Sequence, residues 1–332
     1  MTNMDKLYEA VAARGPVCVG LDTDFSYLPA DFVDTALTKG ENIVRFNKKL
    51  IDATKAVAGC YKVQIAYYES LGLEGMKAYA ETLAAVREAG IPVIADIKRG
   101  DIAKTAEMYA MGHFTGDFES DFVTLAPYMG LDSISPYLPY AEKQGKGMFV
   151  LCRTSNGGAK DFEYEKLADG RHVYDLVGDK LNALGKDYMG EHGYSSIGLV
   201  IGGTHIEEAT EIRAKYQDSF FLIPGYGAQG GKAEDIAQYL TKGNGGVVNS
   251  SRGILLAYKK QPGVGDVLTV RPEDGQQADV LRDDLMAQDS GLTAGCTHGQ
   301  WPPSCSHTRC KRPRRRLRPA ASCRPAGCRG WS

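Results

Sequence analysis

The chain has 332 residues, 43% of them hydrophobic and 24% charged, which is an ordinary composition for a globular protein with a sizeable core. Its formal net charge is −2, but residues 291–332 hold nine Lys and Arg and no acid, so the preceding body carries −11 and is too acidic for a general nucleic-acid surface. The N-terminus lacks the apolar run of a signal peptide, and no later stretch is long enough to span a membrane, so we expect a cytoplasmic protein with no membrane partner.

Short apolar runs alternate with amphipathic segments along the body. Runs that are almost continuously apolar predict strands buried on both faces, and therefore a parallel sheet. The segments between them, such as 43–57 and 73–86, repeat their apolar residues at the three- and four-residue spacing of helices. The eight runs are 16–22, 60–66, 91–98, 121–127, 147–153, 196–203, 219–225 and 245–251.

Eight repeats of strand then helix predict an α/β fold, a closed (β/α)₈ TIM barrel over residues 1–290. An open, doubly wound sheet is the alternative, but its Gly-rich phosphate loop would follow the first strand. Here the first run is followed by "TDFSYLP", and the Gly-rich loops follow the last two runs. TIM barrels often bind phosphate at those two loops, so the barrel is favoured.

A cluster of charged residues ends the third run. Alternate side chains of a strand share a face, so Asp96 and Lys98 are predicted to point toward the barrel mouth, with Asp101 following and Arg99 turned away into a structural ion pair. The second run places Lys62 on the neighbouring strand. The result is a predicted array of Lys62, Asp96, Lys98 and Asp101, in which carboxylates keep both lysines protonated. This array suits Lys98 as a general acid, and a salt-bridged strand end is the structural alternative.

Polar residues also follow other runs. Asp22, at the end of the first run, is either a turn cap or an acceptor for substrate hydroxyls. The loop 224–231, "PGYGAQGG", and Arg252 in "NSSRGIL" are suited to binding an anion, and a phosphate monoester is the leading ligand. The segment 154–156, "TSN", either contacts the edge of a planar ring or forms a turn.

Together these segments resemble the orotidine 5′-phosphate decarboxylase family, in its longer, bacterial-like form. The resemblance covers about 16–258 and rests on "YKVQ", "DIKRGDI", "TSN", "PGYGAQGG" and "SSRG" in the family's order. It implies decarboxylation of orotidine 5′-phosphate to UMP and CO₂, the last step of de novo pyrimidine nucleotide synthesis, with neither a metal nor an organic cofactor. One departure is Gly157, which stands where the family has a proline.

The resemblance further implies a role for each matching residue. Lys98 would deliver a proton to C6 of the pyrimidine as CO₂ departs, with Asp96 beside the departing carboxylate and with Lys62 and Asp101 completing the charged array. The implied substrate contacts are Asp22 and Lys62 with the ribose hydroxyls, Ser155 with the pyrimidine edge, Gln229 and Arg252 with the phosphate, and Pro224 along the pocket wall.

The resemblance also implies a homodimer in which each active site is completed by the neighbouring subunit. The residues that would reach across are Asp101, Ile102 and Thr105. Two alternatives stay open, because the D-x-K-x-x-D motif is shared with related enzymes. One is a magnesium-dependent decarboxylase or aldolase of sugar phosphates from the same superfamily, and the other is a non-catalytic barrel that binds a nucleotide phosphate.

The final segment, 291–332, changes composition abruptly. It is basic and has no apolar periodicity, so we expect a disordered extension, which could also arise from out-of-frame sequence. Its "KRPRRRLR" could bind nucleic acid or an acidic surface through charge alone, and its Cys and His spacing fits no defined zinc motif. Five of the eight cysteines lie there, whereas Cys18, Cys60 and Cys152 of the body are predicted to be buried free thiols.

Overall fold

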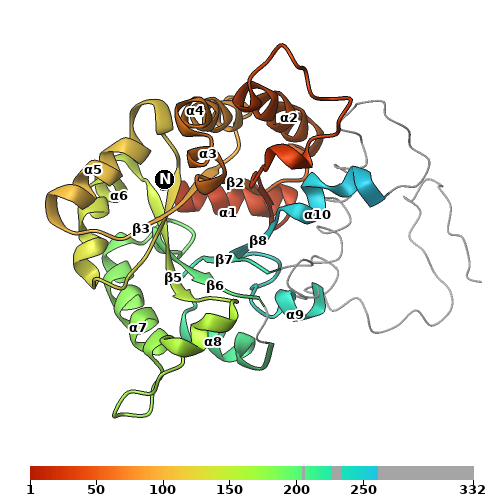
Figure 1. The fold of residues 1–332 in the computed structure, drawn as a ribbon. Helices are drawn as coiled ribbons and strands as arrows, with labels where there is room; N and C mark the ends of the chain where they lie inside the picture. Colours follow the sequence, from red (N-terminus) through yellow and green to blue (C-terminus); the bar gives the residue numbers. More distant parts are fainter. Residues whose placement is uncertain (204–205, 226–232, 261–332) are drawn as a thin grey trace, which may run out of the picture. The chain divides into compact units, whose positions relative to one another are not determined.

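The computed structural model describes residues 1–203, 206–225 and 233–260. Eight parallel strands form a closed barrel (Figure 1). The strands follow one another in chain order, and the first is hydrogen-bonded to both the second and the last. Each of the eight predicted apolar runs contains one strand, so the predicted (β/α)₈ barrel is confirmed. The strands are β1 (Val17–Gly20), β2 (Cys60–Gln64), β3 (Val93–Arg99), β4 (Phe122–Leu125), β5 (Gly147–Arg153), β6 (Ile197–Ile201), β7 (Phe221–Ile223) and β8 (Gly246–Ser250).

Helices follow the strands and surround the barrel (Figure 1). The first two helices each begin with a capping box. Thr2 and Asp5 satisfy each other's backbone N–H groups at the start of the first, and Thr38 and Glu41 do the same at the start of the second. The helices are α1 (Asn3–Arg14), α2 (Lys39–Thr54), α3 (Ala66–Glu69), α4 (Gly72–Glu88), α5 (Ala103–Phe114), α6 (Leu138–Gln144), α7 (Val173–Gly185), α8 (Ala209–Lys215), α9 (Ala233–Ala237) and α10 (Arg252–Leu255).

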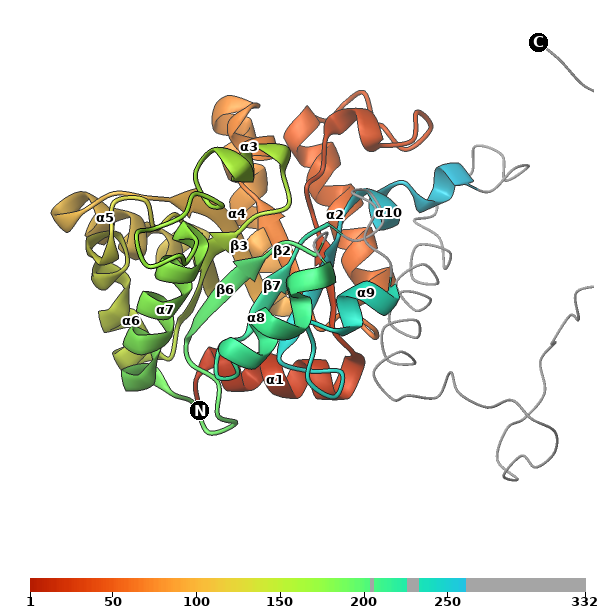
Figure 2. The ribbon, with the colours of Figure 1, turned by 90° about the horizontal axis from the view of Figure 1, so that it is seen from below.

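The barrel interior is a packed core, closed at one end by α1. Inward side chains such as Cys18, Cys60 and Phe122 form one buried cluster with Met4 and Leu7 of that helix. Figure 2 shows α1 running across the end of the barrel below β6 and β7. Since α1 contacts residues that precede the strands, it closes the amino-terminal end, and the carboxyl-terminal end is left for a site.

Cys18, Cys60 and Cys152 are buried free thiols, as predicted. Burial and a hydrogen bond with Cys18 raise the pKa of the Cys60 thiol, which suits an inert structural cysteine. The predicted boundary at residue 290 and the tail 291–332 lie outside the described residues. No helix in the described ranges is long and apolar enough to cross a membrane.

Candidate active site

Three charged side chains from β1, β2 and β3 meet at the carboxyl-terminal end of the barrel. The strand register places Gly20 beside Lys62 and Gln64 beside Asp96, so Asp22 and Asp96 lie on either side of the lysine. The Lys62 Nζ atom is 2.8 Å from Asp22 Oδ1 and 2.9 Å from Asp96 Oδ2. Burial by itself would lower the pKa of Lys62, but the two carboxylates outweigh it and raise that pKa above its ordinary value.

Asp96 is the most heavily hydrogen-bonded carboxylate of the site. Its Oδ2 accepts from Lys62 and, at 2.9 Å, from Gln64 Nε2, while its Oδ1 accepts from Lys98 Nζ at 2.5 Å and from Thr124 Oγ1 at 2.8 Å. Burial acts to raise its pKa, but Lys62, Lys98 and these hydrogen bonds hold the pKa well below the usual range of an aspartate. Asp96 is therefore a fixed negative charge between two cations.

A β-bulge sets the position of Lys98. Between Ala95 and Arg99 the register of β3 against β4 shifts, and Lys98 adopts φ +44°, a left-handed conformation that is rare for a residue with a side chain. Its backbone N–H donates to Thr124 Oγ1 at 2.9 Å, which holds this strained turn. Asp96 and Lys98 do both face the barrel mouth, but simple strand alternation, on which the prediction was based, is interrupted here.

Asp101 lies apart from the other three members of the predicted array. Its Oδ1 accepts from the backbone N–H of Ile102 at 2.8 Å, and within the described residues no lysine pairs with it. Ile102 is 42% exposed and Thr105 is also exposed, so this segment faces away from the chain's own barrel core. Within a single chain the array is therefore Asp22, Lys62, Asp96 and Lys98.

Asp22 is held by a second contact that the sequence did not indicate. Its Oδ2 accepts from Ser251 Oγ at 2.7 Å, which joins the end of β1 to the loop after β8. This approach requires a glycine at position 20, since a Cβ there would lie 2.0 Å from Ser251 Oγ. Ser251 thus orients Asp22 with its hydroxyl.

The segment 154–156 follows β5 and is held by hydrogen bonds within its own loop. Thr154 donates through its backbone N–H and its hydroxyl to the carboxylate of Glu163, at 2.7 and 2.6 Å, and its hydroxyl also approaches Asn156 Oδ1 at 2.7 Å. The turn-forming interpretation therefore holds for Thr154 and Asn156. Ser155 lies between them at the barrel mouth and is partly exposed.

The predicted phosphate contacts lie in the loops after β7 and β8. Pro224 directly follows β7 and is partly exposed, whereas Gln229 lies outside the described residues. Arg252 opens α10 directly after β8, and its side chain is exposed to solvent. The positions of Pro224 and Arg252 put both at the same end of the barrel as Lys62 and Asp96, because parallel strands share one carboxyl-terminal edge.

Arg99 forms the structural ion pair that strand alternation predicted. Its guanidinium donates to Glu69 Oε1 at 2.7 Å and lies over the Tyr109 ring, with 5.2 Å between the guanidinium carbon and the ring centroid. Arg99 thus ties β3 to α3 and α5 behind the site.

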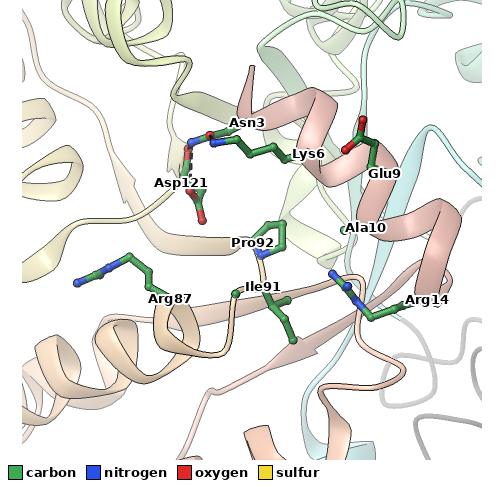
Figure 3. Close-up of a pocket in the computed structure, with 10 residues that line it drawn as sticks. Asn3, Lys6, Glu9, Ala10, Arg14, Arg87, Ile91, Pro92 and Asp121 are labelled. Atoms are coloured by element: carbon green, nitrogen blue, oxygen red, sulfur yellow. Dashed lines mark hydrogen bonds between the residues drawn. The ribbon is translucent and has the colours of Figure 1, made fainter. Parts of the chain in front are cut away.

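A hollow at the opposite end of the barrel contains none of the predicted residues (Figure 3). It lies between α1 and the segments that precede β3 and β4, and its lining includes Lys6, Arg14, Pro92 and Asp121. Asp121 accepts hydrogen bonds from Asn3 Nδ2 in the first turn of α1 and from the backbone N–H of Val93 at the start of β3, so it holds α1 against the barrel. Active sites of TIM barrels lie at the other end, where the charged array is.

Comparison with known proteins agrees with this geometry. Residues 15–264 match the Orotidine 5′-phosphate decarboxylase / HUMPS family. The chain belongs to this family. It is 63% identical over 255 residues to orotidine 5′-phosphate decarboxylase of Clostridium perfringens, covering 77% of this chain and 89% of the relative. The corresponding enzyme of Clostridium acetobutylicum is 60% identical over 258 residues, covering 78% and 90%.

A solved structure supports the family assignment at the level of the fold. The structure of Leishmania donovani OMP decarboxylase superimposes with a TM-score of 0.69 at 32% sequence identity, covering 87% of this chain and 99% of that one. The barrel of this chain therefore has the same fold as a solved OMP decarboxylase.

The sequence did not indicate two of the donors to Asp96, which are Thr124 and Gln64. Thr124 lies in the middle of an apolar run and Gln64 in the apolar run that contains Lys62, and neither position signals a contact with Asp96.

Proposed function

We propose that this chain decarboxylates orotidine 5′-phosphate to UMP and CO₂ in de novo pyrimidine nucleotide synthesis. The observation that carries the proposal is the contact of Lys98 with Asp96. The Lys98 side chain is 45% exposed, whereas that of Asp96 is only 5% exposed and is also paired with the buried Lys62. A reactive cation at the surface of a rigid ionic array is what this reaction requires. The names of the curated relatives favour it over a sugar-phosphate lyase.

The chemical step breaks the bond between C6 of the pyrimidine and its carboxylate. The electron pair of that bond stays on C6, CO₂ leaves, and C6 then takes a proton from the Lys98 ammonium group, which is later reprotonated from solvent. No neighbouring group delocalises the charge on C6, so the protein must stabilise it electrostatically. Lys98 is suited to both tasks because its ammonium group is accessible and is held in place through Asp96.

Asp96 and Lys62 supply a fixed environment for that step. A buried carboxylate next to the substrate carboxylate would repel it and favour its departure as neutral CO₂. Lys62 prevents Asp96 from taking up a proton in response, since the pair is buried and hydrogen-bonded on both oxygens. Binding energy from the distant ribose and phosphate would help to hold the substrate in this position.

The remaining substrate contacts follow from positions around the mouth. Asp22 and Lys62 would bind ribose hydroxyls, Ser155 would contact the pyrimidine edge, and the loops with Pro224, Gln229 and Arg252 would hold the phosphate. Support for the ribose contact comes from the partial exposure of Asp22, at 21%, beside the buried Lys62.

We also propose a homodimer with shared active sites. The start of α5 and its exposed face offer Ile102, Met108 and Met111 to solvent, at 42%, 43% and 47% exposure, and exposed apolar side chains of this kind mark an interaction surface. Asp101 and Thr105 lie on the same segment, so a second copy covering this face would receive them near its own mouth. Cytoplasmic location stays a prediction from the sequence.

The direct test is the loss of orotidine 5′-phosphate absorbance with purified protein, with and without EDTA. Turnover to UMP that is unchanged by the chelator is expected. Metal-dependent turnover of a sugar phosphate, or UMP binding without turnover, would each favour one of the two alternatives.

A further inference from the structure

Arg153, the last residue of β5, is a buried cation at the catalytic end of the barrel that the proposed chemistry does not use. Its side chain is 0% exposed and ranks first by volume among the fully buried side chains. A buried guanidinium is costly unless its donors are engaged. Here Nη1 donates to Glu208 Oε2 at 2.6 Å, while Nη2 donates to the Gly202 carbonyl at 2.7 Å and to the Tyr239 hydroxyl at 2.8 Å; only Nε has no partner among the described residues.

The partners of Arg153 come from different parts of the barrel. Gly202 directly follows β6, Glu208 lies just before α8, and Tyr239 lies just after α9. One guanidinium therefore ties the end of β5 to the two following βα units. A planar group with donors in fixed directions can do this, whereas a lysine ammonium cannot reach all three partners at once.

Two hydrogen bonds of opposite direction join Gly202 and Arg153. The N–H of Gly202 donates to the Arg153 carbonyl at 2.7 Å, and its carbonyl accepts from the Arg153 side chain. The space beside it is filled by Ser155, because a Cβ at position 202 would lie 2.7 Å from Ser155 N and 2.8 Å from Ser155 Cβ. The position of Ser155 is thus set by the position of Gly202.

We propose that Arg153 is a positioning residue that fixes Ser155 against the pyrimidine edge through Gly202. The inference rests on the proposed function, in which Ser155 contacts the base. Arg153 itself is buried, so its effect on recognition of the base passes through Gly202 and Ser155.

Two variants test this in independent ways. Arg153→Lys keeps the positive charge but removes the planar guanidinium group with its several donors. Gly202→Ala keeps Arg153 but places a methyl group where Ser155 lies and so displaces Ser155. Arg213→Lys is the matched control, because Arg213 is also buried, at 7% exposure, and donates to the carbonyls of Gly245 and Ser219 at the opposite end of the barrel. Calorimetry with UMP and with ribose 5-phosphate, and the melting temperature, are measured for all three variants and wild type.

In the full-length protein, Arg153→Lys and Gly202→Ala should each weaken UMP binding about tenfold or more and leave ribose 5-phosphate binding unchanged. Arg213→Lys should lower the melting temperature and change neither affinity. Equal losses for both ligands, or a lowered melting temperature with full UMP affinity, would show that Arg153 is only structural. If Arg153→Lys does not fold, full UMP affinity in Gly202→Ala still overturns the inference. A wild type that binds no UMP would instead refute the proposed function.

Discussion

Lys62 and Asp96 form an ion pair of 2.9 Å in which the two side chains are only 6% and 5% exposed. Such a pair is stable only because other polar groups complete it, here Asp22 on the lysine and Gln64, Thr124 and Lys98 on the carboxylate. The pair is part of the proposed catalytic array, and its removal should therefore affect both folding and turnover.

Lys62→Met should be strongly destabilising, because it removes the cation that lies between the carboxylates of Asp22 and Asp96. We expect a loss of about 3 to 5 kcal/mol in the free energy of unfolding, measured with urea. Lys146→Met is the control, since Lys146 is equally buried but its partner Glu119 is 44% exposed and can be hydrated. Adding Asp96→Asn to Lys62→Met should restore part of the loss. Equal costs for the two single variants would contradict this account.

Lys98→Ala should abolish CO₂ release while UMP still binds. The variant removes the proposed proton donor and the charge beside C6, and each of these effects alone is worth about 10² to 10⁴ in rate. Turnover is followed by loss of substrate absorbance, and UMP binding by calorimetry. Lys77→Ala, at an exposed lysine of α4 that pairs with Glu81, should turn over normally. Turnover like that of wild type in Lys98→Ala would refute its assignment as the general acid.

Thr124→Val tests the hydroxyl that joins Lys98 to Asp96. It removes the acceptor for the Lys98 N–H, whose left-handed backbone then has no support, and one of the four donors to Asp96. We expect about 1 to 3 kcal/mol of lost stability together with a clear fall in kcat. Thr115→Val makes the same change at an exposed threonine that only bonds the Met111 carbonyl, and it should alter neither quantity much.

The fold could be predicted from the sequence because fully buried parallel strands give continuous apolar runs, and all eight are present. The contact of Lys62 with Asp96 was predictable as well, since consecutive strands of a barrel are neighbours. The pairing of Asp22 with Lys62 was not, because register cannot be read from either strand alone. The bulge at Lys98 and the contacts of Arg153 depend on partners that lie 26 to 86 residues away in the chain.

Shared active sites can be tested by mixing two inactive variants. Lys98→Ala lacks the proton donor and Asp101→Ala lacks the proposed contribution to the neighbour, so a mixed dimer would rebuild one complete site. Random reassortment of equal amounts should return about a quarter of wild-type activity, because half of the dimers are mixed and one of their two sites is intact. The mixture is assayed after dissociation and reassociation. If it is no more active than its components, Asp101 serves its own subunit or has no role.

His113 should make the protein less stable in mild acid. Burial is the main cause that lowers its pKa to about 4, with the nearby Arg99 adding to the effect. The imidazole packs against Tyr79 and Phe118 and is neutral in the folded chain near pH 5, whereas an unfolded chain protonates it below about pH 6.5. The unfolded state therefore binds more protons between about pH 6.5 and 4, so stability falls as pH falls through this window, by up to about 3 kcal/mol. Urea unfolding of wild type and His113→Phe at pH 7 and pH 4.5 measures the difference. The variant should lose less stability on acidification than wild type does, and an equal loss in both would show that His113 does not contribute.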